Sequence, residues 1–373
     1  MNLGDIITVA DSEKCGNREF PVLSMTMHDG LVLQTDRFKK AIASKDLSGY
    51  KVVRRNQLVV SFPIDEGVLY IQDVVDAGIV SPAYAVWDVR TDMICPKFLG
   101  MFLRCPKSIQ YYKAKLRGST ARRRTIPRDD FLAMGIPDLS ISDQNRICAI
   151  LEKIGSVIAA STKQIDLLEE LVKSRFVEMF GEVSHNRFPV VRLCDLCLSG
   201  GQYGAAEKAI PYDAEKGRYI RITDIDEFGS LNSEQVSPEN FVKDYLLNEN
   251  DILFARTGAT VGKTYIHKQG FCSYAGYLIR YVPNTALVDP VFLFQYTKTA
   301  NYKHWIGQTM KIGTQPNINS KQYNALPVIL PPLALQREFA AFVAKVDKLA
   351  FAARRRRDLA QQMYRVKIQE FFG

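Results

Sequence analysis

The chain has 373 residues, of which 47% are hydrophobic and 24% are charged. This composition is that of an ordinary globular protein, which excludes a fibrous or wholly disordered chain, and the length predicts two or three domains. The net charge of +9 and a sequence pI of about 9.1 favour a polyanionic partner, above all nucleic acid. A merely basic soluble protein is the alternative, because net charge describes association and not fold.

No apolar run approaches the roughly 20 residues that a membrane-spanning helix needs. The first residues also lack the basic region and cleavage site of a secretory signal, so we expect a cytoplasmic protein. Seven scattered cysteines indicate reduced, mostly buried thiols. Cys194 and Cys197 form a single CxxC pair. Without a second pair or nearby histidines, this pair does not predict a zinc site.

The two halves of the chain align when the sequence is shifted by 192 residues. Phe180 and Gly181 then fall on Phe372 and Gly373, and Gln144 falls on Gln336. A period of this length is too long for a solenoid, whose repeats run to about 20–50 residues. The pattern predicts a duplicated unit, in which a variable globular part is followed by a long helix.

Short strands punctuated by turns are predicted in residues 1–137, followed by a helical stretch from Pro96 to Leu116. The predicted strands are 31–33, 50–53, 58–62, 68–71 and 84–89. Residues 190–330 repeat this order, with a helical stretch after Pro290. Their predicted strands are 219–222, 251–255 and 277–282. Strands mixed with helices in each half predict an α+β fold.

Two long helices follow the globular parts, each of about 39 residues. Apolar residues in the first recur at alternating steps of four and three, which is the heptad pattern of a coiled coil. Ser142 is the predicted N-cap, with Ser140 as the alternative. The predicted coiled-coil positions are Ile147, Leu151, Ile154, Ile158, Ile165, Leu168 and Val172 in the first helix, and Phe339, Val343, Val346 and Tyr364 in the second.

We expect the two long helices to pair with each other in antiparallel orientation, which places the two globular parts at opposite ends. The alternative is that each helix packs only on its own domain or on another subunit. Arg354 to Arg357 interrupt the second helix with four consecutive charges. This run favours a solvated face, with a DNA backbone or an acidic partner as alternatives, and predicts loose packing in mid-helix.

Catalytic motifs are not found in the sequence. The stretch from Gly258 to Thr264 resembles a P-loop but has three residues, where four are required, between its glycines. We interpret Arg256-Thr257-Gly258 as a turn whose backbone comes close to some other group, with Arg256 and Lys263 flanking it. The four histidines lack metal spacing, and neither an adenine-methyltransferase motif nor a nuclease-like carboxylate cluster occurs. The sequence therefore predicts a protein without catalytic residues, bound metal or cofactor of its own.

A loop rich in Gly, Ser and Thr follows the helical stretch in each half, at residues 117–124 and 311–319. Arginine can bind guanine with a fork of donors, and Asn or Gln can do the same to adenine. Hydroxyl groups and lysines suit phosphates, although a solvated basic loop is the alternative for each residue. The predicted DNA contacts are Lys113, Lys115, Arg117, Ser119, Thr120, Arg122, Arg123, Arg124, Arg221, Arg256, Thr257, Lys263, Lys311, Thr314, Gln315, Asn317 and Asn319.

Several stretches resemble a known family. The helix beginnings at 139–147 and 330–339, and the helix ends at 171–181 and 364–373, are similar to the conserved helical regions of type I restriction-modification specificity (S) subunits. Residues 251–263 and 78–84 are similar to stretches of that family's target-recognition domains. The resemblance covers the whole chain, and its helical regions are the most specific part.

The resemblance implies two target-recognition domains, 1–137 and 184–329, and two helical regions, 138–183 and 330–373. Each domain would read one half of a split duplex target, and the helices would fix the spacer between the halves. The helices would also dock two modification subunits, which carry S-adenosylmethionine and methylate adenine at N6. Restriction subunits would join with ATP and Mg²⁺, and the specificity subunit itself would not be catalytic.

The first half departs from this pattern, because its segment Phe62 to Gly67 is acidic where the second half has Arg256-Thr257-Gly258. The two halves should therefore read different sequences, which predicts an asymmetric target. Three alternatives stay open: a type II-like system with a fused methylase–nuclease partner, an enzyme component with its own active site, and a helical scaffold that binds no DNA.

Overall fold

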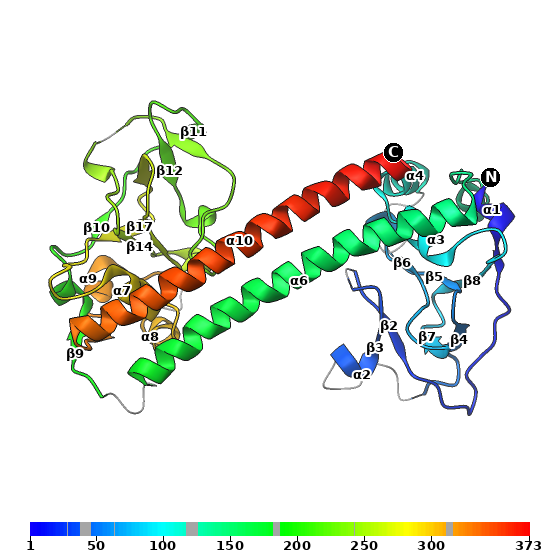
Figure 1. Ribbon diagram of the computed structural model, residues 1–373, viewed down its shortest axis with the longest axis horizontal. Coiled ribbons are helices and arrows are strands. Elements are labelled where there is room, and N and C mark those ends of the chain that lie inside the picture. The colour runs from blue at the N-terminus through cyan, green and yellow to red at the C-terminus, as the bar shows by residue number, and fades with distance from the viewer. Residues whose placement is uncertain are drawn as a thin grey trace. The chain divides into compact units, whose positions relative to one another are not determined.

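The computed structural model describes residues 1–27, 29–37, 46–62, 64–116, 126–181, 187–241, 243–310 and 316–373. The chain forms two compact units: unit 1 comprises Met1–Ser161 with Arg355–Gly373, and unit 2 comprises Thr162–Arg354. The domain boundaries predicted from the sequence separate the globular parts from the helices. The compact units instead combine each globular part with segments of both long helices (Figure 1).

Unit 1 is built on a four-stranded antiparallel sheet with the strand order β1-β8-β5-β6. These strands are β1 (Ile7–Val9), β8 (Ala85–Val89), β5 (Leu58–Val60) and β6 (Leu69–Ile71). Two antiparallel ribbons join β2 (Leu23–Met25) to β3 (Leu31–Leu33), and β4 (Lys51–Arg54) to β7 (Ala77–Val80). The helices are α1 (Leu3–Ile6), α2 (Gln34–Arg37), the 3-10 turn η1 (Ile64–Glu66), α3 (Pro96–Phe102), α4 (Pro106–Lys115), α5 (Arg128–Leu132) and the long α6 (Ile141–Phe180), which continues into unit 2.

Unit 2 has an equivalent four-stranded antiparallel sheet in the order β10-β17-β14-β15. These strands are β10 (Gln202–Tyr203), β17 (Leu278–Tyr281), β14 (Ile252–Ala255) and β15 (Thr264–Ile266). Smaller pairs are β11 (Ala209–Pro211) with β13 (Val236–Pro238), β12 (Arg218–Ile220) with β16 (Cys272–Tyr274), and β9 (Val190–Arg192) with β18 (Pro327–Ile329). The helices are η4 (Leu193–Leu196), η5 (Ile222–Asp224), η6 (Lys243–Tyr245), η7 (Gly258–Thr260), α7 (Pro290–Tyr296), α8 (Ala300–Thr309), α9 (Ser320–Asn324) and the long α10 (Leu333–Phe372), which ends in unit 1.

The 192-residue repeat is visible in this element order. The long helices α6 and α10 each contain 40 residues, and their first residues are numbered 141 and 333, so 333 − 141 = 192. The outer strands follow one plan in both units. β7 pairs antiparallel with β4 and forms a parallel bridge through Val22 and Ile79, while β16 pairs parallel with β12 and forms an antiparallel bridge through Leu246 and Ser273. The helical frame is therefore repeated in strict register, and the outer pairings recur with different lengths.

The structure corrects two details of the sequence prediction. The helical stretch from Pro96 to Leu116 is two helices, because α4 begins at Pro106, whose ring cannot continue the preceding helix. The cap of α6 is the alternative, Ser140, and not Ser142. The Ser140 Oγ accepts a hydrogen bond of 3.1 Å from the Asp143 backbone N–H, which is the geometry of an N-cap.

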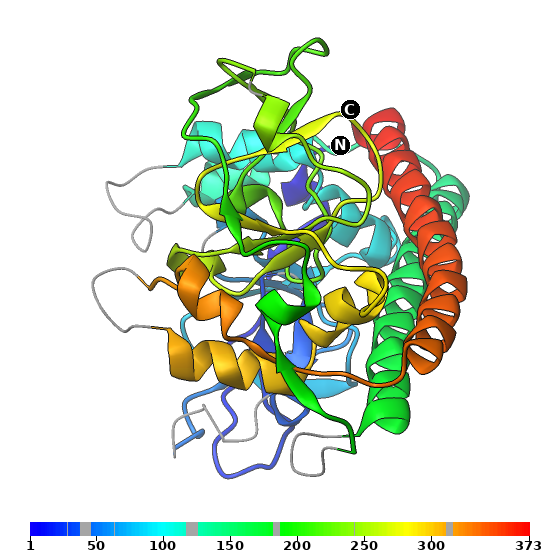
Figure 2. The same cartoon turned by 90° about the vertical axis from the view of Figure 1, so that its left-hand side faces the viewer.

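The long helices pair antiparallel, as predicted. In unit 1 the beginning of α6 and the end of α10 share one core cluster, which includes Ile147, Leu151 and Phe372. In unit 2 the end of α6 lies beside the beginning of α10 (Figure 2). These segments share another core cluster, in which the rings of Phe176 and Phe339 lie 5.4 Å apart. Every predicted coiled-coil residue is buried or half-buried. Small side chains occupy further buried seam positions, namely Ser161 and Ala360 in unit 1, and Ala350 and Ala353 in unit 2.

Two buried glutamines join the helices to the globular parts. Gln144 accepts a hydrogen bond of 2.7 Å from the Cys95 backbone N–H and donates one of 2.9 Å to the Leu139 carbonyl. Gln336, its repeat equivalent, accepts one of 2.8 Å from Asp289 N–H and donates one of 2.8 Å to the Pro331 carbonyl.

Both glutamine side chains are fully buried. Cys95 and Asp289 are the N-cap residues of α3 and α7, so each glutamine satisfies one backbone group on each side of a junction. The same bonds are therefore made once in each unit.

Among the described residues, no helix is both long and apolar enough to cross a membrane.

We predict that Gln336→Ala lowers the free energy of unfolding of unit 2 by roughly 1–3 kcal/mol, because it leaves buried backbone groups without partners. Gln144→Ala should do the same to unit 1. Urea unfolding followed by hydrogen exchange measures the loss and locates it. Gln361→Ala, an exposed position on the same helix as Gln336, is the matched control. An equal effect of all three variants would contradict the proposed role of the buried pair.

Candidate nucleic-acid interface

The fold of unit 2 brings together two segments that the sequence singled out separately. Gly258 N–H donates a hydrogen bond of 3.0 Å to the Pro316 carbonyl, and Ile318 N–H donates one of 2.9 Å to the Arg256 carbonyl. Thr257 and Asn317 form an isolated antiparallel bridge between the same segments. The turn that follows β14 therefore approaches the segment before α9. Arg256 and Asn317 consequently belong to one local surface.

Arg256 has the contacts expected of a recognition residue. Its guanidinium carbon lies 4.7 Å from the centre of the Tyr203 ring, and its buried Nε has no acceptor among the described residues. Tyr203 is itself held by its hydroxyl, which accepts a 2.9 Å hydrogen bond from Ser320 N–H. A planar guanidinium stacked on a fixed ring is preorganised to form a fork of hydrogen bonds.

Two tyrosines of this surface were missed by the sequence prediction. Tyr203 supports Arg256, and Tyr277, whose carbonyl accepts a 3.0 Å hydrogen bond from Arg256 N–H, is 59% exposed. Both belong to segments that come close to Arg256 only in the folded sheet. The one available signal in the sequence was the setting of Tyr203 between glycines, at Gly201 and Gly204.

Other predicted contacts in unit 2 already have partners within the protein. Arg221 forms an ion pair of 2.8 Å with the buried Asp224, and this hydrogen bond raises the pKa of Arg221. Lys263 pairs with Glu227 at 2.9 Å. Asn319 caps α9 by accepting a 2.9 Å hydrogen bond from Gln322 N–H. Thr257 is 4% exposed. These residues remain predictions, but each has less freedom to contact DNA than Arg256.

In unit 1 the structure describes only part of the predicted interface. Lys113 is exposed on α4, and the Lys115 ammonium lies 3.2 Å from a carboxylate oxygen of Asp130. The other predicted contacts of this loop, and three of the second loop, lie outside the described residues. They are Arg117, Ser119, Thr120, Arg122, Arg123, Arg124, Lys311, Thr314 and Gln315.

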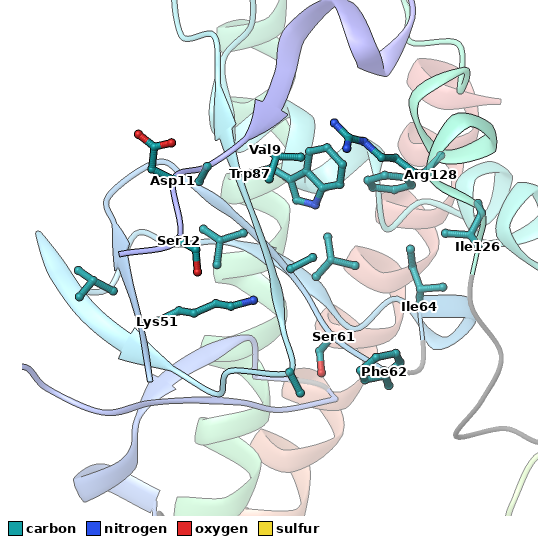
Figure 3. A pocket seen from close by; sticks show the side chains of 17 residues that line it. Val9, Asp11, Ser12, Lys51, Ser61, Phe62, Ile64, Trp87, Ile126 and Arg128 are labelled. Atoms are coloured by element: carbon teal, nitrogen blue, oxygen red, sulfur yellow. The ribbon is translucent and has the colours of Figure 1, made fainter. Parts of the chain in front are cut away.

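The position equivalent to Arg256 is different in unit 1. The turn η1 follows β5 as η7 follows β14, with an offset of 194 residues, and this offset places Phe62 where unit 2 has Arg256. Beside Phe62 lies a cavity of about 360 Å³, lined mostly by apolar side chains (Figure 3). The two units therefore present different chemistry at one repeated place, in line with the expected difference in what they read.

A larger cavity of about 770 Å³ lies within unit 2, and the Lys298 side chain lines it. The Lys298 ammonium donates hydrogen bonds to the Thr264 side chain at 3.1 Å and to the Thr264 carbonyl at 3.3 Å. It also lies 4.6 Å from the centre of the Phe294 ring. Burial lowers the pKa of Lys298 to about 8, because the charged form loses its hydration.

Two kinds of site considered in the sequence, a metal centre and a P-loop, can be compared with the described residues. They contain no group of three or more His, Cys, Asp or Glu that could hold a metal ion. The segment from Gly258 to Thr264 connects the antiparallel strands β14 and β15, whereas a P-loop joins a strand to a helix.

We predict that Lys298 makes the stability of unit 2 depend on pH in the alkaline range. Its pKa is lower in the folded than in the unfolded chain, so the folded chain binds fewer protons above about pH 8 and stability rises with pH there. The difference in urea midpoint between the wild type and Lys298→Met should therefore change in favour of the wild type from pH 7 to pH 9.5. Lys303→Met, at an exposed position, is the control, and an equal pH response of both variants would contradict the assignment.

Comparison with known proteins agrees with this arrangement. Residues 187–359 match the model of the "Type I restriction modification DNA specificity domain". A curated relative, the type I restriction enzyme MjaVIII specificity subunit of Methanocaldococcus jannaschii, is 27% identical over 107 residues. That match covers 29% of this chain and 24% of the relative, so it spans about a quarter of the relative's length.

Two solved structures share the fold over the whole chain. The type I restriction-modification S subunit from M. genitalium aligns with a TM-score of 0.63 and 12% identity, covering 100% of this chain and 95% of that one. A chain from a study of complex assembly and conformational transition of the type I R-M system aligns with a TM-score of 0.52 and 15% identity, covering 100% and 96%. The chain therefore has the fold of these two solved structures, and its residues 187–359 are similar to the type I restriction modification DNA specificity domain.

Proposed function

We propose that this protein is the DNA specificity subunit of a type I restriction-modification complex. The globular part of each unit reads one half of a bipartite, asymmetric duplex target, and the paired helices set the spacing between the halves. The observation that carries the proposal is a repeated frame with diverged surfaces. The long helices and their buried glutamines recur at an offset of 192, whereas Arg256 of unit 2 is matched by Phe62 in unit 1.

The net charge and the stacked guanidinium support DNA as the ligand. The chain carries a net charge of +9, which favours a polyanion. Arg256 combines an aromatic platform with a donor that has no partner among the described residues. Arginine in this state suits a guanine edge, because its two donors match guanine O6 and N7.

A duplicated apolar stripe supports docking of two copies of one partner. Leu167 and Leu171 on α6 are 54% and 47% exposed in unit 2. Their repeat equivalents on α10, Leu359 and Met363, are 53% and 55% exposed in unit 1. Single exposed apolar residues are ordinary, but the same pair recurs at the same register on both helices. We propose that each stripe contacts one modification subunit.

Catalysis and its cofactors belong to the partners in this proposal. The modification subunits would bind S-adenosylmethionine and methylate adenine at N6, and restriction subunits would supply ATP- and Mg²⁺-dependent cleavage. Methylation-site mapping in a host that expresses the whole system tests the function. A split target with unequal halves is expected, and a contiguous target would contradict the two-reader model. Methyl transfer by the isolated chain would contradict its non-catalytic role.

We predict that Arg256→Ala raises the Kd of the assembled complex for its target by about 5- to 150-fold, the range expected for losing one bidentate base contact. Binding to random DNA should change little, and one target position should become degenerate. Lys303→Ala, which removes an exposed positive charge of unit 2 outside the predicted contacts, is the matched control and should leave both constants unchanged. Fluorescence anisotropy on target and random duplexes measures both constants. If Arg256→Ala weakens binding equally on both duplexes, Arg256 contacts a phosphate and not a base edge.

We predict that Leu167→Lys and Leu359→Lys each remove one copy of the modification subunit, and that the double variant removes both. A buried charge at the centre of each contact should weaken docking at least about tenfold. Native mass spectrometry of the co-expressed complex gives the stoichiometry. Leu198→Lys, at a 69% exposed position outside the helices, is the control. Retention of two copies by the double variant would disprove the assignment of the stripes.

A further inference from the structure

The apolar cavity of unit 1 is built on one face of its central sheet. Val60 and Ala85 lie opposite each other in the register of β5 and β8, and Trp87 lies further along β8. Phe62, which is 46% exposed, and Trp87 lie on opposite sides of the cavity (Figure 3). Arg128 stands at the Trp87 side. The volume of about 360 Å³ is within the range of pockets that hold small ligands.

The cavity contains a buried donor without a partner. Trp87 is 7% exposed, and its indole Nε1 is buried without an acceptor among the described residues. Figure 3 shows this nitrogen on the edge of the ring that faces the cavity interior. Buried polar groups are nearly always hydrogen-bonded in native proteins, so an unpaired one calls for an explanation. A ligand that presents an acceptor to Trp87 provides it.

The charged rim of the cavity suits a ligand with an anionic part. The Arg128 guanidinium carbon lies 5.6 Å from the centre of the Trp87 ring, and the Arg128 side chain is exposed. Lys51 also lines the cavity, although its ammonium is engaged by a 2.7 Å hydrogen bond to the Tyr84 carbonyl. The interior is therefore apolar and aromatic, with the exposed cation of Arg128 at one edge and the exposed carboxylate of Asp11 at the other, so an anionic part of a ligand would lie at the Arg128 edge.

The place of this cavity in the repeat indicates its role. Phe62 occupies the position of Arg256, and Arg128 is the equivalent of Ser320, which holds the tyrosine beneath Arg256. Unit 1 thus has aromatic walls and a hollow where unit 2 has a stacked guanidinium. A recognition surface without the arginine fork must obtain affinity from another contact, and stacking of a base on aromatic side chains is one that nucleic-acid-binding proteins use.

We propose that the cavity beside Phe62 and Trp87 is a binding site for a nucleobase. The base enters between the aromatic side chains and accepts a hydrogen bond from Trp87 Nε1, and where the base belongs to a nucleotide, the phosphate of that nucleotide contacts Arg128. A base extruded from duplex DNA and a free nucleoside offer the same ring and acceptor. Extrusion costs unstacking energy, which stacking on the aromatic side chains of the pocket offsets. As a DNA site, the proposal rests on the proposed function of unit 1 as a reader.

Trp87 provides its own probe, since the chain has two tryptophans and Trp305→Phe leaves Trp87 as the single one. This variant of the full chain is titrated with each of the four deoxynucleosides and with 2-deoxyribose 5-phosphate. At least one nucleoside should quench the fluorescence saturably, and the sugar phosphate should not. If no nucleoside does so, the cavity is not a nucleobase site.

Variants of the walls test the geometry, with calorimetry as the readout and circular dichroism as the check on folding. Trp87→Phe keeps an aromatic ring but removes the donor, and should weaken the best-binding nucleoside about 5- to 10-fold. Phe62→Ala, at a half-exposed position, should weaken it by about 5- to 150-fold. Phe241→Ala, with a similarly exposed ring in unit 2, should change nothing. Unchanged affinity in both pocket variants would overturn the proposal.

The source of the base is distinguished in the assembled complex. Target duplexes carry 2-aminopurine, whose emission changes when it leaves the base stack for another aromatic partner, at successive positions of the half-site read by unit 1. A change of emission on binding, confined to one position and altered by Phe62→Ala, assigns the site to DNA, whereas nucleoside binding without such a change assigns it to free nucleosides. Normal target binding with neither signal would overturn the nucleobase site alone. A complex that binds no DNA would instead overturn the proposed function.

Discussion

Antiparallel pairing of the two long helices is the constraint on which the rest of the structure depends. Because of it, each globular part is held between the beginning of one helix and the end of the other. In unit 1 Gln144 of α6 and Phe372 of α10 contact the region around α3. In unit 2 Gln336 of α10 and Phe180 of α6 do the same around α7. In each unit the buried hydrogen bond of the glutamine fixes the position of the helix along the globular part, and the phenylalanine ring adds buried apolar surface.

This frame leaves the recognition surfaces free to diverge. Residues of a globular part that face the helices must fit both the beginning of one long helix and the end of the other. A substitution there leaves a cavity or a buried polar group without a hydrogen-bond partner. The turn after β5 or β14 is not under this packing constraint, and the two units carry Phe62 and Arg256 there. The same scaffold can therefore support an aromatic hollow in one unit and a stacked guanidinium in the other.

The sequence predicted the frame better than the surface. A heptad seam is a local pattern, so the spacing of apolar residues alone assigned Ile147, Val172 and Phe339 to it, and all three are buried. The partner of a charged side chain, by contrast, cannot be predicted from the spacing of neighbouring residues. Arg221 and Arg256 look alike in the sequence, but a buried carboxylate engages the first, and a tyrosine ring from a distant strand supports the second. Tyr203 and the parallel pairing of β12 were missed because both depend on contacts between remote segments.

The division of the helices between the units also has a consequence for the order of folding. Unit 2 is one continuous stretch, from Thr162 to Arg354, and all of its contacts become available when that stretch has been synthesised. Unit 1 begins with Met1 but includes Arg355–Gly373, and the Phe372 ring packs 5.4 Å from that of Phe98. The part of unit 1 that is synthesised first therefore lacks part of its core until the last residues of the segment Arg355–Gly373 are available. Until Phe372 docks, the apolar surface that it covers stays open to water, so chaperones or proteases would meet unit 1 in an unfinished form.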